Sequence, residues 1–82
     1  MAHNTLVLFG GAHCASCKKM SAMLNTHGVQ FKYYGIEEYP TKASLYNVSS
    51  LPTLIVLGAD GTPKHSKVGL VDVRTVKRLL YA

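Results

Sequence analysis

Continuous apolar stretches alternate along the chain with stretches in which apolar residues recur every three or four positions. Thr5–Gly10 is almost wholly apolar and is followed by a second glycine, which is typical of a buried strand. In residues 14–26 the apolar positions have helical spacing, and Gly28 follows as a candidate for the end of a helix. Residues 29–36 alternate at first and are rich in β-forming side chains. The first half therefore predicts a strand, a helix and a second strand.

The second half predicts a short helix, a hairpin and a closing helix. Residues 41–47, after Pro40, have room for the short helix. Residues 54–57 are an unbroken apolar run, expected to be a strand buried on both faces, and residues 64–69 are expected to return as a more polar strand. The Gly-Ala-Asp-Gly sequence at 58–61 is typical of the turn between them. Asp72 is placed to cap a last helix with one apolar face. The predicted order is βαβαββα.

The composition is that of a small chain that can bury a core. Hydrophobic residues make up 48% of the 82 residues and charged residues 16%, which argues against disorder. No apolar run approaches the roughly 20 residues needed to cross a bilayer, and the first residues lack the pattern of a secretory signal. We therefore expect a cytoplasmic protein with no membrane contact, whose cysteines are kept mainly reduced.

The net charge of +5 is high for this length, but the basic residues form no continuous run. They are Lys18, Lys19, Lys32, Lys42, Lys64, Lys67, Arg74, Lys77 and Arg78. Protein surfaces that bind nucleic acids usually have clustered basic residues, so we expect no nucleic-acid partner. A dispersed cationic surface that attracts an acidic protein is favoured. The alternative is a plain solvated surface.

The chain has two cysteines, Cys14 and Cys17, separated by two residues at the predicted start of the first helix. A Cys-x-x-Cys pair in this position indicates a thiol–disulfide redox site. A purely structural disulfide would add little stability, because closing so short a loop removes little entropy from the unfolded chain. A structural zinc site would need four ligands.

The cysteine pair on the first helix, together with the order of elements, resembles the thioredoxin fold in its minimal form. Residues 36–38 and 46–53 are similar to the thioredoxin segment that ends in an isoleucine-proline-threonine loop, here Leu-Pro-Thr. Residues 60–61 and 67–69 are similar to the family's final hairpin and its glycine. The resemblance covers nearly the whole chain. It implies a single α/β domain over residues 1–82, in which helices flank a four-stranded mixed sheet.

The resemblance also implies a substrate groove beside the cysteines. Pro52 would follow a cis peptide bond and pack against the pair, which leaves the backbone of Leu51 free to bond an extended substrate. Gly69 would line the same groove, where a missing side chain lets the substrate backbone approach. The alternatives are a trans proline that begins a strand and a glycine that serves only a turn.

By the same resemblance, Cys14 is the attacking thiolate and Cys17 the resolving thiol, and the exchange needs no cofactor beyond this pair. The physical chemistry agrees, because the N-terminus of a helix stabilises negative charge and lowers a thiol pKa. Ala15 and Ser16 would set the redox potential, with Ser16 a candidate hydrogen-bond donor to the thiolate. His13 and Lys18 would add positive charge, although both residue types are commonly solvated in such positions.

Five residues depart from the thioredoxin pattern. His13 stands where a tryptophan usually precedes the first cysteine, and Ala15-Ser16 replaces glycine-proline. Leu8 occupies the place of the buried acid that assists the second cysteine, and Tyr33 that of its lysine neighbour. The exchange chemistry remains available, but the proton route at Cys17 is left open.

Family and size together imply a small thioredoxin- or glutaredoxin-like redoxin that acts as a monomer. Its expected partners are disulfide-containing proteins, with a thioredoxin reductase or glutathione as the reductant. Very short redoxins of this kind often serve ribonucleotide reductase, and some come from bacteriophages.

A second resemblance leads to a different function. Residues 11–17 also look like the metal loop of heavy-metal-associated domains, the copper-chaperone modules, in which Cys14 and Cys17 would bind Cu(I). That family usually has a methionine where Ala12 stands, ends in a strand, and does not explain Leu-Pro-Thr at 51–53. A binding-only module with the same fold is a third alternative, disfavoured because both cysteines are present.

Overall fold

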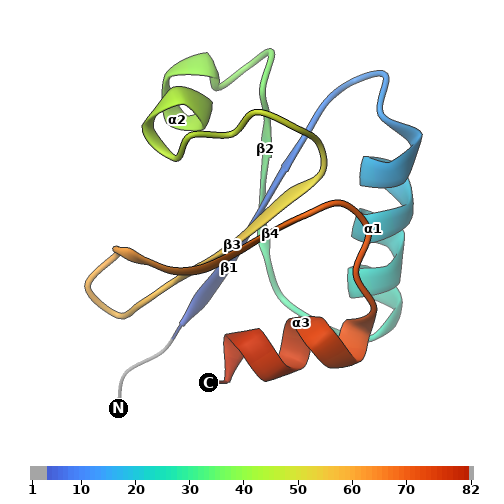
Figure 1. Cartoon of the computed structure of the whole chain (residues 1–82). Coiled ribbons are helices and arrows are strands. Elements are labelled where there is room, and N and C mark those ends of the chain that lie inside the picture. The colour runs from blue at the N-terminus through green and yellow to red at the C-terminus, as the bar shows by residue number, and fades with distance from the viewer. Residues whose placement is uncertain (1–3, 82) are drawn as a thin grey trace.

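The computed structural model describes residues 4–81, which form one four-stranded sheet and three helices (Figure 1). In chain order the elements are β1 (Thr5–Gly10), α1 (Ala15–Thr26), β2 (Lys32–Gly35), α2 (Pro40–Leu45), β3 (Thr53–Leu57), β4 (Pro63–Val68) and α3 (Val73–Leu80). The strands lie in the order β2-β1-β3-β4. β1 runs parallel to β2 and antiparallel to β3, and β3 runs antiparallel to β4. The predicted order βαβαββα and the mixed sheet are confirmed.

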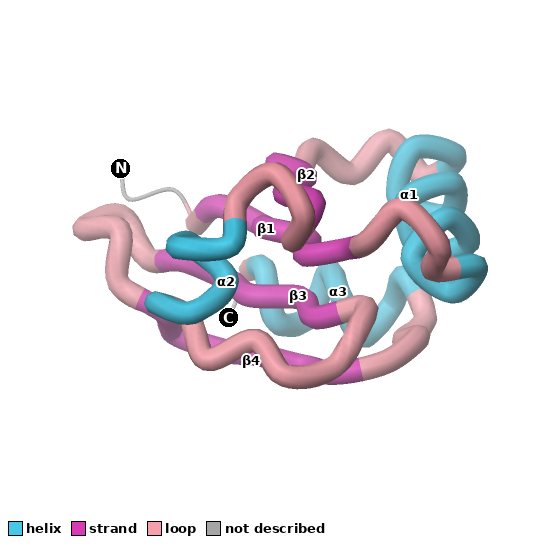
Figure 2. The backbone as a smooth tube through the Cα atoms, turned by 90° about the horizontal axis from the view of Figure 1, so that it is seen from above, coloured by secondary structure: helices cyan, strands magenta, loops and turns pink. Residues whose placement is uncertain are grey.

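The helices cover both faces of the sheet. Met20 and Leu24 of α1 and Val76 of α3 pack with Leu6 and Leu8 of β1 in one apolar cluster. On the opposite face, α2 contributes Ala43 to a second cluster with residues of β1 and β3. Figure 2 shows α2 and α3 on opposite sides of the strands. Because β1 and β3 are central and covered on both sides, their sequences are continuous apolar runs instead of alternating ones.

The second strand is shorter than the predicted 29–36, because its first residues are used to end α1. Gly28 has a positive φ of 67°, and the backbone N–H of Val29 donates to the carbonyl of Leu24 at 2.9 Å. Val29 and Phe31 then pack against the cluster beneath α1 before pairing with β1 begins. The apolar residues at 29–31 are buried because they lie beside the end of a helix. Over so short a length, their spacing cannot be distinguished from that of a strand.

Other boundaries differ from prediction by one or two residues. α1 begins at Ala15 because Cys14 is its cap, and α2 spans Pro40–Leu45 instead of 41–47. β3 begins at Thr53, and β4 spans Pro63–Val68 instead of 64–69 because Gly69 turns away with a φ of 90°. Among the residues described, no helix is long and apolar enough to cross a membrane.

Candidate active site

The two cysteines lie where β1 passes into α1, and their sulfur atoms form a disulfide with 5.2 Å between the Cα atoms. Cys14 is the N-cap of α1: its Sγ accepts a hydrogen bond from the backbone N–H of Cys17 at 3.1 Å. The first turn of a helix has backbone N–H groups without helical partners, and these favour negative charge. The structure therefore places the Cys14 sulfur where a thiolate is stabilised.

The two sulfurs differ in access. Cys17 faces the core from the first turn of α1 and is 1% exposed, whereas Cys14 is half-buried. The difference follows from helix geometry, since the cap residue lies at the open end and Cys17 falls on the same inward face as Met20 and Leu24. A partner can reach Cys14 from solvent, while Cys17 is shielded.

The proline loop lies beside the segment that leads from β1 to Cys14. The Leu51–Pro52 peptide bond is cis, and Pro52 is buried. The side chain of Leu51 reaches the segment before the cysteines, because a Cβ added to Gly11 would lie 3.0 Å from its Cδ1 atom. Gly11 thus provides room for this close approach, and the loop that contains Leu51 and Pro52 stands next to the disulfide end of β1.

Gly69 is joined to the same loop. Its backbone N–H donates to the carbonyl of Pro52 at 2.8 Å, and its φ of 90° is one that residues with a Cβ rarely adopt. A Cβ built at Gly69 meets nothing within 4 Å. The space beside Gly69 is therefore open, and the exposed apolar side chains of Val68 and Leu70 flank it.

Glu37 is a site residue that the sequence analysis did not identify. Its carboxylate, in the turn after β2, accepts the backbone N–H of Ala12 at 3.2 Å. Its own backbone N–H, then that of Ala12, hold the pKa of Glu37 below its usual value, and His13 acts in the same direction. Because 25 residues separate Glu37 from Ala12, no local pattern marks this contact. Only its place in the segment similar to thioredoxins was visible in the sequence.

Tyr33 and Leu8 are neighbours in the paired strands β2 and β1. Leu8 is fully buried in the apolar cluster under α1 and α3. The ring and hydroxyl of Tyr33 occupy the space where a Cβ on Gly10 would stand. The positions that carry an acid and a lysine in the thioredoxin pattern thus hold a buried aliphatic side chain and a phenol that covers Gly10.

The remaining predicted residues surround the disulfide in the loop before α1 and in its first turn. His13, Ala15 and Lys18 are exposed, and Ser16 is half-buried. Their effect on the redox potential stays a prediction.

The metal-loop alternative finds little support in the geometry. Within residues 4–81, no group of three or more His, Cys, Asp or Glu side chains is arranged to hold a metal ion, a finding that concerns sites of the zinc type and does not test a Cu(I) site made of two thiolates. The last described element is helix α3, whereas the heavy-metal-associated fold ends in a strand. The cis Leu51–Pro52 loop beside the cysteines is a feature that this alternative does not explain.

No family model matches the chain, but comparison with known proteins finds similar thioredoxins. A thioredoxin from Chlamydia caviae is 32% identical over 80 residues, covering 92% of this chain and 78% of that protein. Thioredoxin from Fasciola hepatica has the same fold, with a TM-score of 0.81 at 17% identity over 94% of this chain and 78% of the other. A mutant thioredoxin from Halobacterium salinarum gives a TM-score of 0.79 at 28% identity, over 95% and 72% of the respective chains.

Proposed function

This chain belongs to the thioredoxin family, and from that membership and the geometry of its site we propose that it reduces protein disulfides through Cys14 and Cys17. The general activity is thiol–disulfide exchange. Membership of the family and the disulfide in Cys-x-x-Cys spacing both support this activity. The observation that carries the finer proposal is the asymmetry of the pair. Cys14 caps α1 and accepts the N–H of Cys17, while Cys17 is 1% exposed.

In the reduced protein, Cys14 starts the reaction as a thiolate. It attacks one sulfur of a substrate disulfide, a new bond forms between Cys14 and that sulfur, and the other substrate sulfur leaves as a thiolate. The N–H of Cys17 and the N-terminal end of α1 stabilise the attacking charge. Half-burial leaves Cys14 open to the incoming disulfide.

Cys17 completes the exchange. After losing its proton, it attacks the sulfur of Cys14, which releases the substrate as a dithiol and leaves Cys14 and Cys17 joined as in the present structure. Two electrons have then passed from the protein to the substrate. No cofactor is required, because the cysteine pair itself carries the electrons.

The surface formed by Leu51, Pro52 and Gly69 is the proposed place for an extended substrate. The Leu51–Pro52 loop and the open space at Gly69 lie on the same side of the disulfide end of the sheet, since Gly69 bonds to Pro52 and Leu51 contacts the segment before Cys14. A substrate backbone can approach there and bond to the loop by strand addition.

The proposed partners are disulfide-containing proteins, with ribonucleotide reductase as one candidate, and a thioredoxin reductase or glutathione as the electron source. We propose a monomer that works in the cytoplasm. These assignments rest on family membership and small size.

The test separates the two cysteine roles. With a protein disulfide substrate and a dithiol reductant, the natural chain should accelerate reduction, and Cys14→Ser should abolish the acceleration. Cys17→Ser should instead accumulate a mixed disulfide through Cys14, visible by mass spectrometry. Trapping through Cys17 in the Cys14→Ser variant, with none through Cys14, would reverse the assignment. Tight Cu(I) capture without disulfide exchange would favour the metal-binding alternative.

A further inference from the structure

The loop that leads from β1 into α1 is held by a carboxylate from a different part of the chain. Oε2 of Glu37 accepts the backbone N–H of Ala12 at 3.2 Å. A Cβ added to Gly11 would lie 3.3 Å from the same oxygen and 3.0 Å from the Cδ1 atom of Leu51. The turn after β2, the loop before Cys14 and the proline loop therefore meet at Gly11.

The backbone fixes where this carboxylate lies. The N–H of Ile36 donates to the carbonyl of Gly10 at 2.9 Å, which continues the pairing of β2 with β1. The N–H of Glu38 then donates to the carbonyl of Gly35 at 3.1 Å. Glu37 thus projects from a turn that is bonded to the sheet on one side and to itself on the other, and the strands position its side chain.

The carboxylate is close enough to act on Cys14 through its charge. Ala12 is two residues before Cys14, and two residues span at most about 7 Å. With 3.2 Å between its oxygen and the Ala12 nitrogen, Glu37 lies within roughly 10 Å of the Cys14 backbone, the distance over which charges interact in about 0.1 M salt. Backbone N–H groups, its own first and then that of Ala12, lower the pKa of Glu37, which favours its ionised form.

Other charged side chains lie near the cysteine pair. The basic ones in the same segment are His13, Lys18 and Lys19. After the backbone N–H groups, the charge of His13 also lowers the pKa of Glu37, so the carboxylate interacts with the residue directly before Cys14. The second acid of the turn, Glu38, is directed at Gly35, where an added Cβ would lie 3.0 Å from its Oε1 atom.

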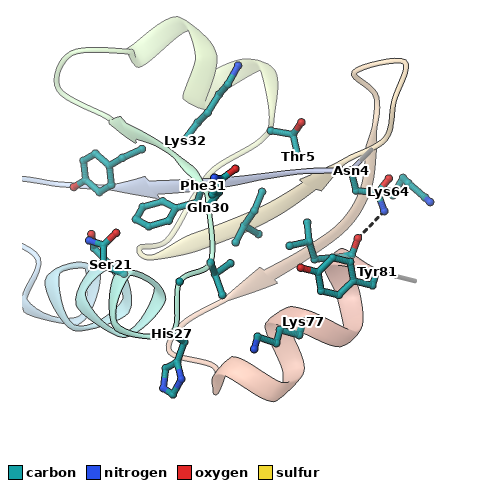
Figure 3. Close-up of a pocket in the computed structure, with 16 residues that line it drawn as sticks. Asn4, Thr5, Ser21, His27, Gln30, Phe31, Lys32, Lys64, Lys77 and Tyr81 are labelled. Carbon is teal, nitrogen blue, oxygen red and sulfur yellow. Dashed lines mark hydrogen bonds between the residues drawn. The ribbon is translucent and has the colours of Figure 1, made fainter. Parts of the chain in front are cut away.

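The remaining neighbours change this charge little. Residues 48–52 of the proline loop and residues 68–71, which include its bonded partner, contain no ionisable side chain. A groove of about 1450 Å³ between β2, the end of α1 and the end of α3 is lined by Lys32, Lys64 and Lys77 (Figure 3). It meets α1 at the end opposite to Cys14, and the 12 residues of this helix extend about 18 Å. This basic groove is therefore separate from the disulfide.

We propose that Glu37 is a positioning residue which, from its bond to Ala12, makes the pair of Cys14 and Cys17 a stronger reductant. Its negative charge disfavours the thiolate of Cys14, which exists in the reduced protein and not in the disulfide. Destabilising the reduced form shifts the equilibrium toward the disulfide, so the protein gives up its two electrons more readily. This inference rests on the proposed redox function and assigns a residue that adjusts it.

Equilibration with glutathione at about pH 8 and low salt tests the inference, because much of the Cys14 thiol is then ionised. Two molecules of reduced glutathione convert the protein disulfide to the dithiol and leave as glutathione disulfide, so the reduced fraction gives the equilibrium constant. Glu37→Gln keeps an oxygen at the bond to Ala12 but removes the charge. It should raise the equilibrium constant for reduction about two- to threefold. The difference should shrink in about 1 M salt, where screening acts within about 3 Å.

Asp60→Asn is the matched control. It changes the net charge by the same amount, but Asp60 lies in the β3–β4 hairpin, at the end of the sheet away from the cysteines. Its equilibrium constant should stay close to that of the natural chain. A second measurement is alkylation of Cys14 with iodoacetamide as a function of pH. The midpoint should move to lower pH in Glu37→Gln and stay in place in Asp60→Asn.

The outcomes separate this inference from the redox function itself. An unchanged or lower equilibrium constant in Glu37→Gln, or an equal rise in Asp60→Asn, overturns the role of Glu37 and leaves the redox function intact. Failure of the natural chain to exchange with glutathione at all would instead overturn the redox function, and the inference with it.

Discussion

The carboxylate of Glu37 accepts a hydrogen bond from the backbone N–H of Ala12, with 3.2 Å between the oxygen and the nitrogen. This contact joins the turn after β2 to the segment that leads into Cys14. Backbone N–H groups favour the ionised form of Glu37, so the contact places a carboxylate next to the loop that precedes Cys14, the proposed nucleophile.

We expect Glu37→Ala to loosen this loop and Glu37→Gln to leave it largely in place. Alanine removes the acceptor, whereas glutamine keeps an oxygen in the same position without the charge. Amide hydrogen exchange at Ala12 should therefore be faster in Glu37→Ala than in Glu37→Gln. Exchange at an amide of α3 serves as the control. Equal exchange at Ala12 in both variants and the natural chain would show that the bond does not hold the loop.

The stability of the protein should fall in acid because three carboxyl groups have pKa values below their usual ones. Backbone N–H groups lower the pKa of Glu37, Thr62 that of Asp60, and Thr75 that of Asp72. The unfolded chain binds protons at higher pH than the folded one, so unfolding takes up protons. The stabilisation is fully present above about pH 5. It is lost as the pH falls below the ordinary values of 4.5 for Glu and 3.8 for Asp and through the lowered folded values.

Urea midpoints measured from pH 7 to pH 3 check this expectation. The midpoint should fall most below pH 5. Asp72→Asn keeps a side-chain oxygen at the cap of α3 but cannot titrate, so its midpoint should change less over the same range. A midpoint that stays constant or rises between pH 5 and pH 3 would contradict the assignment.

Gly10→Ala should destabilise the protein through a collision with Tyr33. The new Cβ would overlap the ring and hydroxyl of Tyr33, which must move away from β1. Overpacking of this kind typically costs about 1–3 kcal/mol. In a double-mutant cycle, Tyr33→Ala should remove most of the cost of Gly10→Ala, as judged by urea denaturation. Additive effects of the two substitutions would mean that Tyr33 does not cause the loss.

Gly69→Ala and Gly61→Ala form a pair that separates backbone strain from function. Both glycines have positive φ values, 90° and 83°, and a Cβ built at either meets nothing within 4 Å. Both substitutions should therefore cost a similar free energy of unfolding, about 1–2 kcal/mol. Only Gly69 is bonded to the proline loop beside the disulfide, whereas Gly61 lies in the β3–β4 hairpin.

Steady-state reduction of a protein disulfide distinguishes the two variants. Gly69→Ala should raise KM, since the added methyl group obstructs the substrate backbone, and Gly61→Ala should leave KM near that of the natural chain. A similar KM in both variants would remove Gly69 from the substrate groove.

Much of the architecture could be predicted because it depends on local periodicity. The unbroken apolar runs at β1 and β3, the helical spacing in α1 and the turn residues at 58–61 identified the elements and their order. The strand predicted at 29–36 was too long, because Val29 bonds back to Leu24 at the end of α1. Helix ends and strand starts compete for the same backbone groups, and sequence spacing does not show which wins.

By itself, the sequence determined the chemistry: two thiols separated by two residues at the start of a helix, and the resemblance that singled out Leu51, Pro52 and Gly69. The tertiary structure alone decided how distant segments meet. Parallel pairing of β2 with β1 brings Tyr33 over Gly10 and sets the turn containing Glu37 against Ala12. It also leaves β2 at one edge of the sheet and β4 at the other. Such contacts join residues far apart in the chain, and they depend on strand order and packing, which no local pattern encodes.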